Sequence, residues 1–275
     1  MASETIGIIA GGGQFPFLVA HGARELGMRV AAVGFTGHTD MTLGESTDAF
    51  RELHIGQLAR LIGFFREEGV KRIVLAGAIN KPRALDIRPD FRAVKLLFKL
   101  RTKGDDAILK TVAAELESEG FSVVSALALV PGLGTPAGPL TSKAPRESDW
   151  DDLRYGWPKA KAIGAMDIGQ SLIVKNGMVV AVEGPEGTDE ALRRAGRLVG
   201  PGCVLVKVYK PGQDDRIDLP AAGLQTVRTM IEIGASCLGI EAGKSLFFDL
   251  AEAVELAERH DIRIIGLTPE EMGGE

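Results

Sequence analysis

Short apolar runs alternate with amphipathic segments along the first half of the chain. Four apolar runs predict buried strands, at residues 5–11, 28–35, 70–79 and 121–129. Three segments with helical spacing lie between them, at residues 14–27, 55–69 and 105–120. Because short strands alternate with helices, the pattern predicts a Rossmann-like α/β domain, in which helices cover both faces of a parallel sheet.

The second half predicts another α/β domain. Residues 171–184 are typical of a β-hairpin, because Asn176-Gly177 is a strong turn signal. Further strands are predicted at residues 203–210, 237–243 and 262–267, and helices at residues 157–170, 188–198, 224–234 and 250–261. Thr188 or Asp189 is the expected N-cap of the helix that begins there.

The stretch from Phe121 to Ser142 carries no charge and separates the two halves. It is long enough to cross a bilayer, but Pro131, Pro136 and Pro139 interrupt it, so it predicts a strand followed by a linker. We therefore expect domains at residues 1–133 and 134–275.

The segment MASETIGIIAGGG has no basic leader, which favours a cytoplasmic protein.

Composition narrows the class of protein. The 275 residues are 45% hydrophobic and 25% charged, the balance of a globular protein with a real core. The net charge of −5 gives no global basic field and argues against a nucleic-acid partner. Cys203 and Cys237 form no CxxC motif, and reduced thiols are the simplest interpretation.

The loop AGGGQFP follows the first predicted strand. Gly11, Gly12 and Gly13 would allow close backbone approach to a ligand, and the helix that begins near Gln14 offers free N–H groups to an anion. A tight strand-to-helix turn is the equally good structural alternative. A dinucleotide site is disfavoured, because Pro16 occupies the third glycine position and no acid ends the second strand.

Two further loops carry polar residues where strands end or helices begin. AGAINKP holds Asn80, and TKGDDAIL holds Gly104, Asp105 and Asp106. The aspartates could cap a helix and complement its dipole, or they could bind a metal or a substrate. The sequence leaves both interpretations open.

The segment from residue 80 to residue 103 is strongly basic. It contains eight lysines and arginines against two aspartates. Phe91, Val94, Leu97 and Phe98 recur at helical spacing, with basic residues between them. A basic amphipathic helix suits an anionic lipid surface or an amphiphilic substrate, whereas the alternative is a helix packed on its own domain.

Several motifs occur together in one order. They are AGGG at the first strand, KGDD at a helix start, DIGQ, VAVEGPEGTDE, and KVYKPGQDDRIDLPAAGLQT. In this order the chain resembles the LpxI type of UDP-2,3-diacylglucosamine pyrophosphatase, over roughly residues 5 to 267. Each motif is only moderately specific, but their joint order is highly specific.

The resemblance implies an enzyme of lipid A synthesis. Such enzymes hydrolyse UDP-2,3-diacylglucosamine to UMP and 2,3-diacylglucosamine 1-phosphate, called lipid X, by attack of water on the sugar-side phosphorus. They need Mg²⁺ or another divalent cation with oxygen ligands. The family's metal-binding aspartate falls in R-x-D-x-P, which here makes Asp218 the metal ligand. The substrate's acyl chains imply a protein peripherally associated with the inner membrane, and a homodimer is left open.

The chemistry of the residues agrees with this resemblance. The four histidines and two cysteines show no ligand spacing, so a hard cation held by carboxylates is favoured over zinc or iron. We expect Asp218, Arg216 and Lys210 to be the catalytic residues, the two cations facing phosphate. The expected substrate-binding residues are Gly11, Gly12, Gly13, Gln14, Asn80, Gly104, Asp105, Asp106, Gln170, Glu186, Gly187, Thr188, Asp189, Lys207 and Gln213.

Two other functions remain as alternatives. The glycine loop could belong to a nucleotide-sugar oxidoreductase, against which the missing acid after the second strand argues. A nucleotide-sugar or lipid carrier would bind the same compound without turnover, but its carboxylate clusters would have no evident task.

Overall fold

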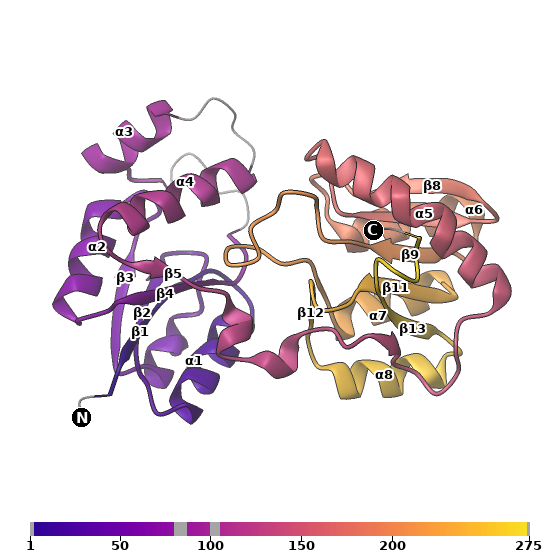
Figure 1. The fold of residues 1–275 in the computed structure, drawn as a ribbon, viewed down its shortest axis with the longest axis horizontal. Coiled ribbons are helices and arrows are strands. Elements are labelled where there is room, and N and C mark those ends of the chain that lie inside the picture. The colour runs from indigo at the N-terminus through magenta and orange to yellow at the C-terminus, as the bar shows by residue number, and fades with distance from the viewer. Residues whose placement is uncertain (1–2, 80–86, 100–104, 274–275) are drawn as a thin grey trace. The chain divides into compact units, whose positions relative to one another are not determined.

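The computed structural model describes residues 3–79, 87–99 and 105–273 (Figure 1). Its contacts divide the chain into two compact units. The first unit contains Met1–Gly132 and Asp214–Asp218, and the second contains Leu133–Gln213 and Leu219–Glu275. The five-residue insertion from the second half of the chain into the first unit was not part of the boundary that the sequence predicted.

The first unit is built on a parallel five-stranded sheet in the order β3-β2-β1-β4-β5. The strands are β1 (Thr5–Ala10), β2 (Arg29–Phe35), β3 (Ala49–Leu53), β4 (Arg72–Ala76) and β5 (Ser122–Val123). The central strand β1 is buried along its whole length. This sheet confirms the predicted Rossmann-like parallel-sheet domain.

Helices cover both faces of this sheet. They are α1 (Phe15–Glu25), α2 (Leu58–Glu67), α3 (Phe91–Lys99) and α4 (Asp105–Ser118), with 3-10 turns at Met41–Ser46, Ala126–Ala128 and Pro131–Leu133. Side chains of β1 alternate between the faces, since Ile8 packs with α1 and Ile9 packs with α2 and α4. The two cores therefore lie on opposite sides of one sheet.

Two strands of the first unit differ from the prediction. The edge strand β3 was missed because its sequence, AFREL, has no apolar run and exposes Arg51 and Glu52. The strand expected at residues 121–129 is only two residues long, because Ser125 caps a 3-10 turn by accepting a hydrogen bond from the Leu127 amide at 3.3 Å.

The second unit contains a mixed six-stranded sheet in the order β6-β13-β11-β9-β7-β8. Its strands are β6 (Gly138–Pro139), β7 (Ser171–Lys175), β8 (Met178–Val182), β9 (Val204–Lys207), β11 (Cys237–Glu241) and β13 (Arg263–Leu267). β9, β11 and β13 are parallel, and β6, β7 and β8 pair antiparallel at the edges. A separate two-stranded pair joins β10 (Ala221–Ala222) and β12 (Leu246–Phe247).

Helix α5 (Glu147–Ala165) covers one face of this sheet, and α6 (Thr188–Val199), α7 (Leu224–Ile233) and α8 (Leu250–Arg259) cover the other. Along β9, Val204 and Val206 pack with α5, whereas Leu205 packs with the other three helices. The predicted second α/β domain is confirmed. The hairpin turn is confirmed too, since Asn176 and Gly177 have φ values of 52° and 70°.

Two helix starts in this unit differ from the prediction. Helix α5 begins ten residues earlier than the predicted residue 157, at Glu147, where the Asp149 carboxylate accepts a hydrogen bond from the Arg146 amide at 2.9 Å. The expected caps of α6 were wrong: Gly187 is the N-cap, with φ 84° and no side-chain cap. Thr188 and Asp189 are the first two helical residues instead.

No helix in the described ranges 3–79, 87–99 and 105–273 is long and apolar enough to cross a membrane.

Two glycines of the first unit make a matched test of backbone packing. A Cβ at Gly11 would lie 2.4 Å from the carbonyl oxygen of Gly77, whereas a Cβ at Gly63 in α2 would meet nothing within 4 Å. Gly11→Ala should cost about 1–3 kcal/mol of stability. Gly63→Ala should add up to about 1 kcal/mol, because alanine favours a helix interior. Thermal melting followed by circular dichroism measures both, and an unchanged midpoint for Gly11→Ala would contradict this packing.

Candidate functional site

Several buried polar side chains lie at the carboxyl edge of the second unit's sheet. β9 ends at Lys207 and β11 ends at Glu241, in neighbouring parallel strands. β7 runs antiparallel to β9, so its first residue, Ser171, pairs with Lys207. Ligands of open α/β sheets bind at this edge.

Lys207 is the most buried cation of this group, with 4% of its surface exposed. Its Nζ donates a hydrogen bond to Thr188 Oγ1 at 2.7 Å, and Thr188 Oγ1 donates to Glu183 Oε1 at 2.8 Å. Burial acts to raise the pKa of the Glu183 carboxyl. The charge of Lys207 and hydrogen bonds from Ser171 and Thr188 outweigh burial, so this pKa lies below its usual value.

Gln170 lies beside this group. Its backbone amide faces Glu183 Oε2 at 3.4 Å, and its carbonyl accepts from the Val208 amide at 2.9 Å. Its side-chain Oε1 is buried and has no hydrogen-bond partner among the described residues. A buried unpaired acceptor costs about 1–3 kcal/mol, which a donor on a ligand would relieve.

Asp189 lies next to Thr188 in α6, where burial raises the pKa of its carboxyl.

Glu241 forms a second buried group at the same edge. Its Oε2 accepts from Lys161 Nζ at 2.6 Å and from the Tyr209 amide at 2.8 Å. The Lys161 ammonium also lies 5.0 Å from the ring centre of Trp157. These contacts hold the loop that follows β9.

That loop leads to Lys210 and Gln213. Lys210 Nζ donates to Asp167 Oδ1 at 2.9 Å, and the Lys210 amide donates to Gln213 Oε1 at 3.1 Å. The Tyr209 hydroxyl donates to the carbonyl of Gln213. The structure therefore brings two of the predicted site residues, Lys210 and Gln213, into contact.

Glu186 has a different environment from the one expected of a substrate ligand. Its carboxylate accepts from Arg194 Nη2 at 2.6 Å in an exposed ion pair. A hydrogen bond from the Glu186 backbone amide and then the bond from Arg194 lower the pKa of the carboxyl. The neighbouring Gly187 supplies the left-handed turn before α6.

The segment Asp214–Asp218 forms a turn within the first unit. Arg216 donates to both carboxylate oxygens of Asp214, at 2.9 and 2.6 Å, and to Glu117 Oε1 at 2.6 Å. The bonds from Arg216 lower the pKa of Asp214. Ile217 packs against the apolar core of this unit, and the Asp218 amide donates to the Asp214 carbonyl at 3.2 Å.

This turn limits which carboxylates could hold a metal. Both oxygens of Asp214 accept hydrogen bonds from Arg216, and Asp215 and Asp218 are the other acids of the turn. The described part of the chain contains no group of three or more histidine, cysteine or acidic side chains placed for a metal. Mg²⁺ needs no such cage, because it is usually held by one or two carboxylates with water and substrate phosphate. The acids of this turn fit that ligand set.

The glycine loop after β1 packs against the loop after β4. The Gly11 amide donates to the Ala76 carbonyl and the Gly12 amide to the Ala78 carbonyl, both at 2.7 Å. Two amides that an anion would use are therefore taken by the protein. Of the other predicted residues, Asn80 and Gly104 lie outside the described residues, and Asp105 and Asp106 begin α4. The ligand roles of these residues stay predictions.

Comparison with known proteins adds to this geometry. Residues 5–133 match the family model described as the LpxI N-terminal domain, and residues 136–265 match the LpxI C-terminal domain. The chain belongs to the LpxI family. A relative in Caulobacter vibrioides, named UDP-2,3-diacylglucosamine pyrophosphatase LpxI, is 32% identical over 277 residues, covering 97% of this chain and 98% of the relative.

Solved structures of other families resemble this LpxI-family chain only weakly. An ADP complex of N5-carboxyaminoimidazole ribonucleotide synthetase has a TM-score of 0.29 at 16% identity, covering 72% of this chain and 36% of its own. A biotin carboxylase domain of a thermophilic 2-oxoglutarate carboxylase with ADP has a TM-score of 0.26 at 13% identity, covering 62% and 35%. Likeness at this level carries no functional argument.

Sequence reasoning missed several members of the site. Glu183 and Glu241 each follow or end an apolar strand, in MVVAVE and CLGIE. An acid at the carboxyl end of a buried strand is the signal that could have identified them. Lys161 gave no such signal, because it lies in a helix with other lysines.

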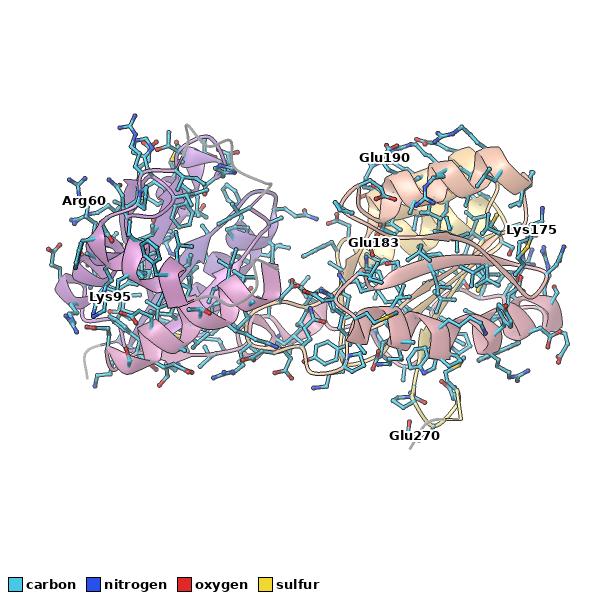
Figure 2. All side chains as sticks on the ribbon, turned by 90° about the horizontal axis from the view of Figure 1, so that it is seen from above. Arg60, Lys95, Lys175, Glu183, Glu190 and Glu270 are labelled. Atoms are coloured by element: carbon cyan, nitrogen blue, oxygen red, sulfur yellow. The ribbon has the colours of Figure 1, made fainter. Side chains whose placement is uncertain are left out.

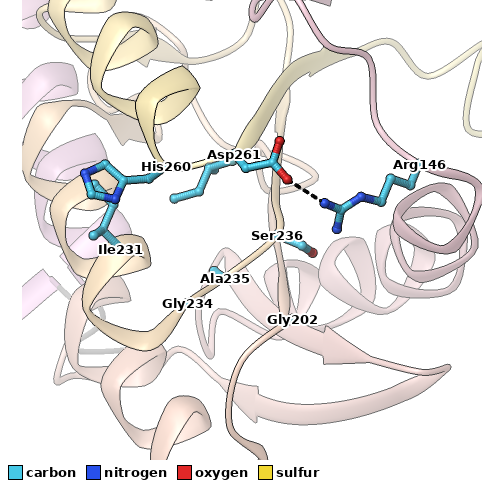
Figure 3. Close-up of a pocket in the computed structure, with 9 residues that line it drawn as sticks. Arg146, Gly202, Ile231, Gly234, Ala235, Ser236, His260 and Asp261 are labelled. Carbon is cyan, nitrogen blue, oxygen red and sulfur yellow. Dashed lines mark hydrogen bonds and ion pairs between the residues drawn. The ribbon is translucent and has the colours of Figure 1, made fainter.

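A hollow of about 390 Å³ lies at the opposite, amino edge of the same sheet (Figure 3). Ser236 and Ile262, which line it, directly precede β11 and β13, and Gly202 lies two residues before β9. Arg146, His260 and Asp261 stand at its rim.

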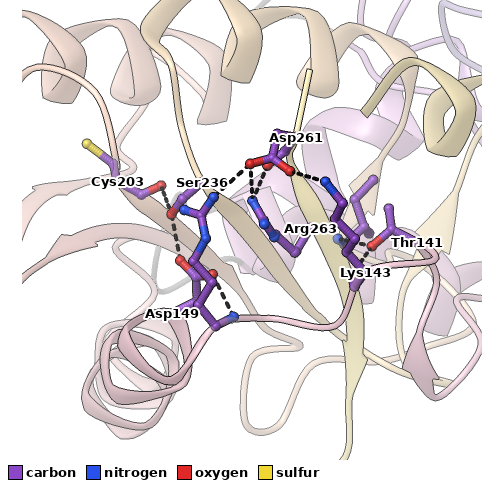
Figure 4. A network of polar contacts seen from close by, with 9 residues as sticks. Thr141, Lys143, Asp149, Cys203, Ser236, Asp261 and Arg263 are labelled. Atoms are coloured by element: carbon purple, nitrogen blue, oxygen red, sulfur yellow. Dashed lines mark hydrogen bonds and ion pairs between the residues drawn. The ribbon is translucent and has the colours of Figure 1, made fainter. Parts of the chain in front are cut away.

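The charges around this hollow are paired with one another (Figure 4). Asp261 accepts from Lys143 and Arg146 at 2.7 Å each and lies 2.9 Å from Arg263. The buried Asp149 accepts from Ser236 Oγ at 2.8 Å. The network ties the start of α5 to the segment after α8.

The Asp261 carboxylate gives a test of this network. The Lys143 and Arg263 hydrogen bonds lower its pKa from 3.8 to about 2. A depressed folded pKa means that the charged form stabilises the protein above pH 4, and that this stability is lost as pH falls towards 2. Asp261→Asn keeps the left-handed backbone and should melt lower than wild type at pH 7, and the gap should close in acid. Asp151→Asn, an exposed position on α5, should show no such pH-dependent gap.

Proposed function

We propose that this protein hydrolyses the pyrophosphate of UDP-2,3-diacylglucosamine to UMP and lipid X in lipid A synthesis. The observation that carries the proposal is the similarity to the Caulobacter vibrioides pyrophosphatase across 97% of this chain. The buried cation and the unpaired amide oxygen at the carboxyl edge of the second sheet support it. A phosphate oxygen would accept from the Lys207 ammonium, and an N–H or O–H group elsewhere on a nucleotide sugar would donate to Gln170 Oε1.

The proposed reaction is a displacement at the sugar-side phosphorus. The oxygen of water bonds to that phosphorus, the phosphorus–oxygen bond to the bridging oxygen breaks, and UMP leaves with the bridging oxygen. Two protons of water end on products or solvent. Negative charge on the pyrophosphate opposes attack, so the protein must supply positive charge and hold the reactants in place.

Lys207 is the residue best suited to bind a phosphate oxygen. Its ammonium is buried, so its charge acts in a medium of lower dielectric than water. Lys210 and Arg216 were expected to share this task. In the structure they pair with Asp167 and with Asp214 and Glu117, respectively. We assign them to holding the loop and the turn in shape.

Asp218 would hold the divalent metal, with Asp215 as the neighbouring acid. A bound Mg²⁺ would neutralise phosphate charge and polarise the phosphorus–oxygen bonds. Asp218 is the ligand assigned to the metal because it occupies the R-x-D-x-P motif, Arg216-Ile217-Asp218-Leu219-Pro220.

Release of UMP by purified protein tests the proposal directly. Turnover of UDP-2,3-diacylglucosamine with Mg²⁺, measured by coupled detection of UMP, is the expected result. Binding without UMP release would favour a carrier, and nicotinamide-dependent oxidation of the nucleotide sugar would favour an oxidoreductase. Hydrolysis in ¹⁸O-water should place the label in lipid X and leave UMP unlabelled.

Asp218→Ala should abolish Mg²⁺-dependent turnover, by at least about 10²-fold, because it removes the charge that anchors the metal. Steady-state UMP release across a Mg²⁺ titration measures this effect. The control is Asp151→Asn, at an exposed position on α5 outside the site, which should retain wild-type activity. Turnover of Asp218→Ala near that of wild type would show that another carboxylate holds the metal.

Helix α3 supports a peripheral contact with the membrane. Phe91 and Phe98 are 86% and 88% exposed, and Leu97 is 50% exposed. Ala93 and Leu96 on the other side are buried in the core of the first unit. Lys95 lies exposed between these apolar residues (Figure 2). Large apolar side chains beside positive charge suit an anionic lipid surface, at about 1 kcal/mol per basic residue.

Lys95→Glu with Lys99→Glu should weaken binding to anionic vesicles and lower activity on membrane-presented substrate, because it reverses the charge beside the exposed phenylalanines. Activity on substrate dispersed in detergent should change much less. Phe91→Ser with Phe98→Ser should have the same selective effect. Leu26→Ser, at an apolar position of 55% exposure after α1, is the control. Equal effects on both forms of substrate would contradict a membrane role.

A further inference from the structure

Lys207 makes fewer hydrogen bonds than its ammonium group has N–H donors. An ammonium carries three N–H donors. Within the part of the chain that the structure describes, the bond to Thr188 Oγ1 is the one hydrogen bond of Lys207 Nζ. The residue is only 4% exposed, so water has little access to the remaining donors. A buried cation with unused donors is arranged to receive acceptor oxygens from a ligand.

The position of this ammonium depends on the Thr188 hydroxyl. A hydroxyl has one proton, and here it points to Glu183 Oε1 at 2.8 Å. An oxygen lone pair therefore faces Lys207 Nζ and accepts its hydrogen bond at 2.7 Å. The ionised Glu183 can only accept, so the direction of both bonds in the chain Lys207–Thr188–Glu183 is fixed.

Glu183 is itself held in place. Its Oε2 lies 3.4 Å from the Gln170 amide, and a hydrogen bond from Ser171 also reaches its carboxylate. Lys207 and Glu183 form no direct ion pair within 4.0 Å in this described region, so the lysine charge is balanced through the threonine without a carboxylate covering it. Lys207 Nζ therefore keeps N–H donors that its bond to Thr188 Oγ1 does not use.

We propose that Glu183 is a positioning residue, which orients Thr188 so that Lys207 presents its remaining N–H donors to a phosphate oxygen of the substrate. This assignment rests on the proposed pyrophosphatase function. It gives a role to an acid outside the predicted metal motif. Glu190, in the first turn of α6, differs because it pairs with Arg193. Figure 2 shows both acids in the second unit.

Thr188→Val and Thr188→Ser form the sharpest pair of variants. Valine has nearly the shape of threonine but removes the hydroxyl, whereas serine keeps it. Thr188→Val should lower kcat by about 10²-fold, the loss seen when one donor to a developing oxyanion is misplaced. Thr188→Ser should remain within a few-fold of wild type. Glu183→Gln should resemble Thr188→Val, and Glu190→Gln, the same chemical change at an exposed position, should leave kcat unchanged.

Binding of inorganic pyrophosphate, measured by calorimetry, separates this inference from the proposed function. Wild type and Thr188→Ser should bind pyrophosphate at least about tenfold more tightly than Thr188→Val and Glu183→Gln. This comparison holds even if wild type releases no UMP, which would overturn only the proposed function. Equal pyrophosphate affinity in wild type and Thr188→Val, or no binding by wild type, would overturn the positioning role. A lower melting temperature in Thr188→Val with unchanged kcat and affinity would show that the hydroxyl is only structural.

Discussion

Pairing between buried parallel strands is the constraint on which both units of this protein depend. β1 lies between β2 and β4, and β11 lies between β9 and β13, with apolar side chains on both faces. Such strands have no room for a charge along their length. Polar chemistry is therefore confined to strand ends, and Lys207 and Glu241 occupy neighbouring ends in one sheet.

The lysines at this edge differ in the partners that they contact. Lys161 pairs with Glu241, and Lys210 pairs with Asp167, so these lysines carry ion pairs inside the protein. Lys207 instead reaches its carboxylate through a hydroxyl. A lysine that is already paired with a carboxylate binds a phosphate less strongly, because its positive charge is partly neutralised. Thr188 therefore distinguishes Lys207 from Lys161 and Lys210.

Much of the fold could be predicted from the sequence because apolar periodicity is a local property. The strand at residues 5–11 and the hairpin at Asn176-Gly177 have signals contained within a few residues. β3 and the first ten residues of α5 could not be predicted this way. β3 is an edge strand with only partial burial, and the start of α5 depends on a cap supplied by Asp149. Boundaries of this kind are set by tertiary contacts.

The candidate site was predictable only in part, for a related reason. Lys207 and Thr188 could be predicted because both lie in the motifs that carry the family resemblance. Glu183 and Lys161 acquire their roles from partners 5 and 80 residues away in the chain. The motif VAVEGPEGTDE does not show how Glu183 and Glu186 differ. The structure instead gives Glu183 a buried hydroxyl and Glu186 an exposed arginine.

The insertion of Asp214–Asp218 into the first unit has a consequence for the order of events during synthesis. Ile217 packs against the core of a unit whose other residues end at Gly132, so that core lacks one of its parts until the ribosome has made most of the second unit. At about 5–20 residues per second, this leaves an interval of several seconds. During that interval the apolar surface which Ile217 later covers, and the Glu117 carboxylate which Arg216 later binds, face solvent.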